Sequence, residues 1–285
     1  MDSKQDQIRT GSFNTSFHES GAPDAAPILL LHGSGPGANA MSNWQFALPF
    51  LGKTYHCFAP DLAGFGLSTY PNPPQGAAAW IEIWVAQMVA FLDALNLEKV
   101  HLVGNSMGGG VAMHLVNRYP NRFDHVVLMG AVGAPFTATE GLKRGWGYYT
   151  KGTKEELAFL VRKFLHNPDI LGGDVDAIAE NRYQFVMQDS VRLQFEAMFP
   201  GDTQTHIDAF VLPPEKLQKI TNPILATHAR EDFFIPLTTS EYMVKHLPRA
   251  QLHVFSQCGH WIQIEQRKAF NNLVKLFFDG DLDQA

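Results

Sequence analysis

A serine lies between two glycines in residues 104–108 (GNSMG), which have the spacing G-x-S-x-G. A short apolar run, residues 100–103, precedes the motif, and a helix-compatible run, residues 111–119, follows it. In this strand–turn–helix context Ser106 is expected at the tip of a sharp turn, with its hydroxyl free to attack a carbonyl carbon. The alternative is a glycine-rich turn with an incidental serine. Catalysis therefore requires that the chain also supply a base, an orienting acid and an oxyanion hole.

A base for this serine is expected in His260, one of twelve histidines. His260 follows the predicted strand 251–255 across a short turn, which places it at a carboxyl strand end, as Ser106 is. Asp232 follows the predicted strand 223–227 and is the candidate for the acid that holds the histidine in one tautomer. The adjacent Glu231 is the alternative acid. The three roles then occur in the order Ser, Asp, His, each after a strand.

An oxyanion hole needs two N–H groups directed at one point. Met107, the residue after the candidate nucleophile, is expected to supply one of them. The second is expected from the loop at residues 32–38 (HGSGPGA), where we assign it to the Ser34 N–H. Glycines in that loop let a ligand approach the backbone closely. Two loops are thus expected to surround the serine.

The candidate loops belong to a regular alternation of predicted strands and helices. Strands are expected at residues 27–32, 55–60, 100–103, 124–129, 223–227 and 251–255, and helices at 42–51, 80–95, 239–246 and 267–278. Residues 12–19 are expected to form one or two edge strands. This alternation predicts an α/β fold, with a parallel sheet covered by helices on both faces. Ligands bind beyond the carboxyl ends of the strands in such sheets, where the candidate loops lie.

The alternation is interrupted at residues 134–212. This stretch shows no clear strand, and it combines helical periodicity with many aromatic residues. We expect a helical cap that covers the site, inserted into a core domain formed by residues 1–133 and 213–285. Most aromatic residues of the cap are expected to form its own core.

Composition narrows the class of protein. The 285 residues are 45% hydrophobic and 18% charged, as in globular proteins with a sizeable core. A net charge of −6, with no cluster of basic residues, disfavours a nucleic-acid partner. No apolar run is long enough for a transmembrane helix, and the N-terminus is too polar for a signal peptide. Cys57 and Cys258 are expected as buried thiols, with one disulfide as the alternative. We therefore expect a cytoplasmic protein with no membrane partner.

The motifs resemble those of the α/β-hydrolases, whose triad has the order Ser, Asp, His. More closely, residues 32–38, 42–44 (SNW), 104–110 and 252–261 (LHVFSQCGHW) resemble the meta-cleavage product hydrolases, which cut a carbon–carbon bond in ring-opened aromatic compounds. The resemblance runs from residue 26 to the C-terminus. It implies an eight-stranded, mostly parallel sheet with an inserted helical cap, a homo-oligomer (a dimer or larger), and no metal or cofactor.

The resemblance also implies a reaction. The substrate is a 2-hydroxy-6-oxohexa-2,4-dienoate with a substituent at C6, and the products are 2-hydroxypenta-2,4-dienoate and a carboxylic acid. Ser106 attacks the C6 carbonyl of the keto tautomer, His260 acts as base and acid, and Asp232 orients it. Water then hydrolyses an acyl-enzyme. Residues 139–148 and 197–200 resemble members that act on small C6 substituents such as hydrogen, methyl or small alkyl.

Further roles follow from the resemblance for residues that bind the substrate. Arg182 matches a cap arginine that binds the substrate carboxylate through its guanidinium fork, with a surface arginine as the alternative. The matched positions near the dienoate end are Asn43 and Asn105, and Trp261 matches a tryptophan at the cavity, with core packing as its alternative. The cap also contains Arg144, Arg162 and Arg192.

Two other functions are compatible with the sequence. A carboxylesterase or lactonase on the same scaffold would share the triad and the oxyanion hole, so only the carboxylate pocket separates it from a carbon–carbon bond hydrolase. A non-catalytic, hydrolase-like binding protein usually lacks a member of the triad, and candidates for all three members are present here.

Overall fold

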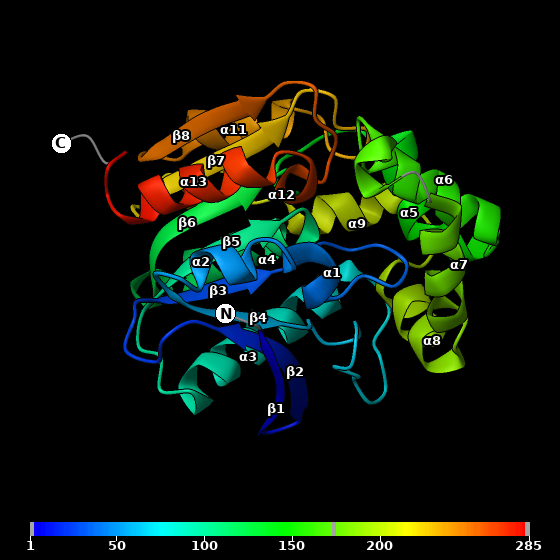
Figure 1. Cartoon of the computed structure of the whole chain (residues 1–285), viewed down its shortest axis with the longest axis horizontal. Helices are drawn as coiled ribbons and strands as arrows, with labels where there is room; N and C mark the ends of the chain where they lie inside the picture. Colours follow the sequence, from blue (N-terminus) through cyan, green and yellow to red (C-terminus); the bar gives the residue numbers. More distant parts are fainter. Residues whose placement is uncertain (1–2, 173–174, 283–285) are drawn as a thin grey trace.

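The computed structural model describes residues 3–172 and 175–282 (Figure 1). Its strands form one sheet in the order β1-β2-β4-β3-β5-β6-β7-β8. β2 runs antiparallel to both β1 and β4, and the remaining pairs are parallel. The strands are β1 (Lys4–Thr10), β2 (Phe13–Ser20), β3 (Pro27–Leu31), β4 (His56–Pro60), β5 (Val100–Asn105), β6 (Phe123–Met129), β7 (Ile224–Ala229) and β8 (Ala250–Phe255). The predicted eight-stranded, mostly parallel sheet is confirmed.

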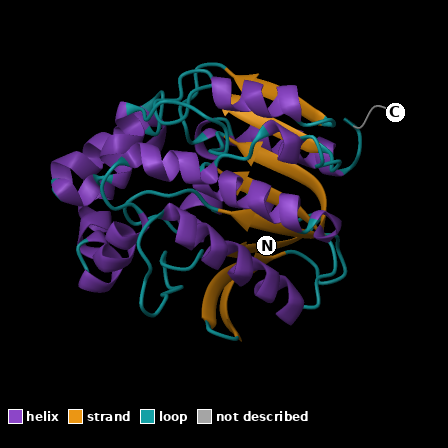
Figure 2. Cartoon of the chain, turned by 180° about the vertical axis from the view of Figure 1, so that it is seen from behind, coloured by secondary structure: helices purple, strands orange, loops and turns teal. Residues whose placement is uncertain are grey.

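Helices cover both faces of this sheet (Figure 2). Side chains alternate along a strand, so in β3 Leu29 and Leu31 pack on one face and Ile28 and Leu30 on the other. The first face carries α3 (Ala77–Ala94), α4 (Met107–Arg118) and α11 (Thr238–His246). The second carries α1 (Ala40–Trp44), α2 (Leu48–Leu51) and α13 (Arg267–Phe278). Both faces are therefore apolar, as is typical of a parallel sheet buried between helices.

Two local predictions were wrong. The sequence predicts one helix at residues 42–51, but the chain forms the two short helices α1 and α2. Pro49 lies in the first turn of α2, and proline has no N–H to continue a helix from the preceding turn. In addition, β1 and not β2 is the edge strand, because β2 pairs with strands on both of its sides.

Helix α3 meets the length and composition of a membrane-spanning helix, alone among the helices of the described residues. Half of its 18 residues are buried inside the protein. Trp80, Trp84, Met88 and Phe91 are among its side chains in the core. An apolar composition of this kind is typical of a helix that packs against a sheet.

Between β6 and β7 the described residues form helices and no strand. The helices are α5 (Glu140–Trp146), α6 (Lys154–Lys163), α7 (Val175–Val186), α8 (Asp189–Met198), α9 (Thr203–Phe210) and α10 (Pro214–Leu217), with 3₁₀ turns at Tyr148–Thr150 and Pro168–Leu171. Helices α5 to α8 lie together beyond one end of the sheet (Figure 1). Helix α9 instead reaches the core, where Phe210 stacks on Trp84. The long insertion leaves β6 and β7 directly paired, with Met129 opposite Thr227.

Candidate active site

Ser106 occupies the turn between β5 and α4. Its backbone φ of +55° is rare for a residue with a side chain, and such strain is typical of functional sites. The flanking glycines permit this turn, because a Cβ on Gly104 would lie 2.6 Å from the Gly108 carbonyl oxygen, and one on Gly108 would lie 2.4 Å from the His32 carbonyl oxygen. The predicted strand–turn–helix context of the motif is confirmed.

The side chain of Ser106 is free to react. The residue is 5% exposed, and its hydroxyl has no hydrogen-bond partner among the described residues. Its N–H donates to the Met129 carbonyl oxygen over 2.8 Å, which fixes the turn to the end of β6. The hydroxyl therefore sits on a backbone that is fixed to the neighbouring strand.

His260 and Asp232 form a buried pair at the ends of β8 and β7. The Nδ1 of His260 lies 2.6 Å from Oδ2 of Asp232, and the other carboxylate oxygen accepts the N–H groups of Phe234 (2.8 Å) and Ile235 (3.0 Å). A carboxylate held in this way keeps the proton on Nδ1 and leaves Nε2 as the basic atom. Glu231, the alternative acid, is directed elsewhere and accepts from the Cys258 N–H.

Asp232 is ionised in the folded protein. Burial acts to raise the pKa of its carboxyl group, but His260, the nearby His228 and the Ile235 N–H act to lower it, and the lowering contributions prevail. His228 was not predicted from the sequence, since in β7 it reads as a core position. Its Nε2 lies 3.7 Å from Oδ2 of Asp232 and 2.9 Å from the Ile235 carbonyl oxygen. Burial lowers the pKa of His228, and the charge of Asp232 acts in the opposite direction.

Gly130, which follows β6, is a second contact that the sequence did not reveal. Its φ is +50°, and a Cβ there would lie 3.2 Å from Oδ2 of Asp232 and 3.3 Å from the His260 ring. A side chain at this position would press on the acid–base pair. The backbone at the end of β6 thus lies directly against the pair of Asp232 and His260.

The loop after β3 lies directly against the nucleophile turn. A Cβ on Gly33 would lie 3.1 Å from the Ser106 Cβ. The loop is fixed by His32, whose Nδ1 donates to the Gly33 carbonyl oxygen (2.8 Å) and whose Nε2 accepts from the Leu62 N–H (3.0 Å). The hydroxyl of Ser34 accepts a hydrogen bond from Trp146 Nε1 of α5 (2.7 Å). Side-chain contacts therefore hold the loop in place without engaging the Ser34 N–H.

Both candidate oxyanion donors are unengaged. In the part of the chain that the structure describes, neither the Ser34 N–H nor the Met107 N–H donates to a protein acceptor. Met107 begins α4, so its N–H belongs to the first turn of a helix, where backbone donors have no intrahelical acceptor. Two free donors beside a serine hydroxyl are what a developing oxyanion requires.

The four candidate substrate-binding residues line one small cavity together with His260 and Ser34. Its lining includes Asn43, Asn105, Arg182 and Trp261. Asn43 accepts from the Asn105 amide (2.5 Å) and from the Gly33 N–H (3.3 Å). The buried Oδ1 of Asn105 has no partner among the described residues. The cavity is thus polar at the end where the asparagines lie.

Arg182 differs from the other candidate arginines between β6 and β7. Arg144, Arg162 and Arg192 each pair with a carboxylate, on Glu156, Asp176 and Glu196 respectively. Arg182 has no acidic partner among the described residues, and its guanidinium lies 5.9 Å from the Trp261 ring centre. Burial lowers its pKa, although an arginine remains charged at neutral pH. A partly buried positive charge without an anion favours an anionic ligand in this cavity.

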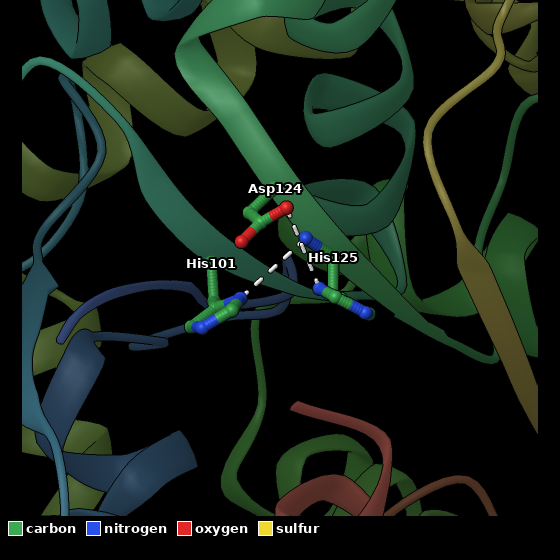
Figure 3. Close-up of side chains that lie close together, drawn as sticks. All are labelled: His101, Asp124 and His125. Atoms are coloured by element: carbon green, nitrogen blue, oxygen red, sulfur yellow. Dashed lines mark hydrogen bonds and ion pairs between the residues drawn. The ribbon is translucent and has the colours of Figure 1, made fainter. Parts of the chain in front are cut away.

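A second cluster of titratable side chains lies at the opposite end of β5 (Figure 3). A bulge places two residues of β6 opposite His101, so that ligand atoms of His101, Asp124 and His125 lie within 4.8 Å of one another. These atoms already interact with protein, since His101 Nδ1 accepts the His125 N–H (3.4 Å) and Asp124 pairs with Lys99 (3.3 Å). Burial lowers the pKa of His101 to about 4, and its ring stacks on Phe278. We assign the cluster a structural role.

The class of protein is defined by three features: a mostly parallel sheet between helices, a serine on a strained turn after β5, and a His–Asp pair after β7 and β8. Together they define an α/β-hydrolase. The family model described as alpha/beta hydrolase fold matches residues 26–266. A solved serine hydrolase from the polyaromatic hydrocarbon-degrading bacterium Cycloclasticus zankles is 59% identical, with a TM-score of 0.98 over 99% of this chain and 100% of that one.

Two curated relatives indicate which group of α/β-hydrolases the chain belongs to. The 2-hydroxymuconate semialdehyde hydrolase of a Pseudomonas species is 40% identical over 94% of this chain and 91% of its own length. The 2-hydroxy-6-oxo-2,4-heptadienoate hydrolase of Pseudomonas putida is 37% identical over 96% of both. The chain belongs to the α/β-hydrolase family, and within it to the meta-cleavage product hydrolases.

Proposed function

We propose that this enzyme hydrolyses the carbon–carbon bond next to the C6 carbonyl of 2-hydroxy-6-oxohexa-2,4-dienoates, to give 2-hydroxypenta-2,4-dienoate and a carboxylic acid. The observation that carries this proposal is the unpaired Arg182 in the cavity that also holds His260 and the free Ser34 N–H. An ester or lactone without a carboxylate would leave this guanidinium desolvated and unpaired. The names of the relatives support the same substrate class.

The substrate is proposed to bind with its carboxylate at Arg182. The unsatisfied Oδ1 of Asn105 and the amide of Asn43 then face the 2-hydroxy or 2-oxo group. Trp261, whose ring stacks on Phe164 at 4.5 Å, packs along the apolar carbon chain of the substrate. This orientation directs the C6 carbonyl toward Ser106.

Cleavage is proposed to follow conversion of the dienol to its keto tautomer. His260 takes the proton of the Ser106 hydroxyl as its oxygen attacks C6, and the N–H groups of Ser34 and Met107 stabilise the oxyanion. When the carbon–carbon bond breaks, the departing fragment takes its electrons into the conjugated ketone and receives a proton from His260. Water, activated by the same histidine, then hydrolyses the acyl-enzyme. Asp232 keeps the imidazole in the required tautomer throughout.

We further propose a preference for hydrogen, methyl or small alkyl at C6. The cavity is small, and next to Ser34 the indole of Trp146 stacks on Phe199 at 4.4 Å, so that aromatic side chains fill this region. A panel of dienoates with hydrogen, methyl, isopropyl and phenyl at C6 tests the proposal through kcat/KM. We expect the phenyl substrate to be poorer than the methyl substrate by roughly tenfold or more. Equal values across the panel would contradict the preference, and faster hydrolysis of p-nitrophenyl acetate than of every dienoate would contradict the proposed function.

Replacement of Arg182 by alanine is expected to weaken binding of a dienoate by about 2–4 kcal/mol, since the substrate carboxylate loses a charge-assisted, desolvated partner. Hydrolysis of the neutral p-nitrophenyl acetate should change little. The measurement is KM and kcat for both substrates. Arg162→Ala is the matched control, because that arginine pairs with Asp176 on the exposed surface. Equal losses with both substrates would remove Arg182 from the carboxylate site.

Two expectations from the sequence complete the proposal: a homo-oligomer and a cytoplasmic location. Light scattering of the purified protein and fractionation of the source cells test them separately from the chemistry.

A further inference from the structure

The loop that carries His260 is held by the helical insertion. It joins β8 to α12 (Ile262–Glu265), and it packs on the short segment between α6 and the following 3₁₀ turn, residues 164–167, which we call the docking segment. A Cβ on Gly259 would lie 2.7 Å from backbone atoms of Phe164, Leu165 and His166. The backbone of the histidine loop and the backbone of the docking segment are therefore in direct contact.

The carboxylate of Glu265 binds both of these backbones. Its Oε1 accepts from the Asn167 N–H (2.8 Å) and the His166 N–H (2.9 Å). Its Oε2 accepts from the His166 N–H (3.0 Å) and from the N–H of Gly259 (2.6 Å), the residue before His260. One half-buried side chain thus joins the insertion to the histidine loop.

A second connection lies on the other side of His260. The Trp261 N–H donates to the Phe164 carbonyl oxygen over 3.0 Å, and the Phe164 ring lies 5.8 Å from the His260 ring. The residues before and after His260 are therefore both bound to the docking segment, one through Glu265 and one directly. The loop is also anchored by Asp232, which accepts from His260 Nδ1 (2.6 Å), and by Glu231, which accepts the Cys258 N–H (3.2 Å).

We propose that Glu265 is a positioning residue that makes the placement of His260 depend on the seating of the docking segment. Hydrogen bonds from N–H groups to a carboxylate are stronger than neutral ones, so the bridge is held firmly while the segment is in place. When the segment leaves, Gly259 loses its constraint and the imidazole loses its alignment. Proton transfer is then fastest when the insertion is closed over the substrate. This inference rests on the proposed function in taking His260 as the base.

The test compares Glu265→Gln and Glu265→Ala with Glu241→Gln, an exposed glutamate on α11, as the matched control. Glutamine keeps the shape but turns an NH₂ group toward one of the N–H donors. We expect kcat to fall roughly tenfold for glutamine and up to about a hundredfold for alanine, with KM changed little, because small misplacements of a catalytic group have effects of this size. Hydrogen exchange should rise at the amides of residues 166, 167 and 259 and stay unchanged elsewhere.

Both a dienoate and p-nitrophenyl acetate serve as substrates. The proposed function and the positioning role of Glu265 can then be tested independently. If the wild-type enzyme does not cleave dienoates, the proposed function fails, while ester hydrolysis still reports on Glu265. Wild-type kcat on both substrates in a folded Glu265→Gln protein would overturn the positioning role. A loss of activity that only follows a lower melting temperature, without local hydrogen exchange, would overturn it as well. If the alanine variant does not fold, the glutamine variant decides.

Discussion

Replacing Ser106 with alanine is expected to reduce turnover of 2-hydroxy-6-oxohexa-2,4-dienoates by roughly a thousandfold or more, while the substrate still binds. The variant lacks the oxygen that attacks C6 but keeps Arg182 and the asparagine pair that hold the other end of the substrate. Loss of the yellow dienolate absorbance measures turnover. Titration of the same absorbance at enzyme excess measures binding.

The control for this variant is Ser190→Ala, because Ser190 is exposed on α8. That protein should retain wild-type rates. A Ser106→Ala enzyme with more than about a tenth of the wild-type kcat would contradict nucleophilic catalysis by this serine. It would favour a mechanism in which a base activates water directly.

Replacing Asp232 with asparagine is expected to lower kcat by roughly 10³- to 10⁴-fold, with little change in the fold. The amide oxygen can still accept the N–H groups of Phe234 and Ile235. The amide NH₂ then faces Nδ1 of His260, and two donors cannot share that contact. The ring takes the opposite tautomer, which leaves Nε2 protonated and unable to accept the proton of Ser106. The measurement is kcat from pH 6 to 9, with the melting temperature as a check on folding.

Glu231→Gln separates the two candidate acids. Its carboxylate pairs with Arg230 (2.7 Å) and accepts the Cys258 N–H, so the variant should lose far less activity than Asp232→Asn. A larger loss at Glu231 than at Asp232 would reverse the assignment of the orienting acid.

Most of the fold follows from local patterns in the sequence. The apolar runs of the central strands and the amphipathic α13 are strong signals because each is set by burial against the sheet. β1 is polar and strongly exposed, so its strand comes from pairing with β2 and not from any pattern of its own. The break between α1 and α2 shows the reverse case, since Pro49 lies in the first turn of a second helix where the apolar pattern alone favours one continuous helix.

The candidate site is predictable only where its residues carry motifs. Ser106, Asp232 and His260 each follow a strand at a recognisable turn. Gly130 and His228 touch the acid–base pair only because β6, β7 and β8 are neighbours in the sheet. Only the family resemblance separates Arg182 from Arg144, Arg162 and Arg192 in the sequence, because the physical difference is which of them finds a carboxylate in the folded chain. No sequence motif marks Glu265, because its role depends on its contact with the docking segment in the folded protein.

The helical insertion leaves the sheet after β6 and returns to it at β7, which is the neighbouring strand. Because the two strands pair directly, the intervening residues can vary in length and sequence without moving the strand ends that hold Ser106, Asp232 and His260. The insertion must still provide a segment whose backbone matches Gly259 and Glu265, in addition to the contact of Trp146 with Ser34 and the packing of Phe210 on Trp84. An insertion grafted from a relative should therefore retain activity only if it also reproduces the backbone contact with Gly259 and Glu265.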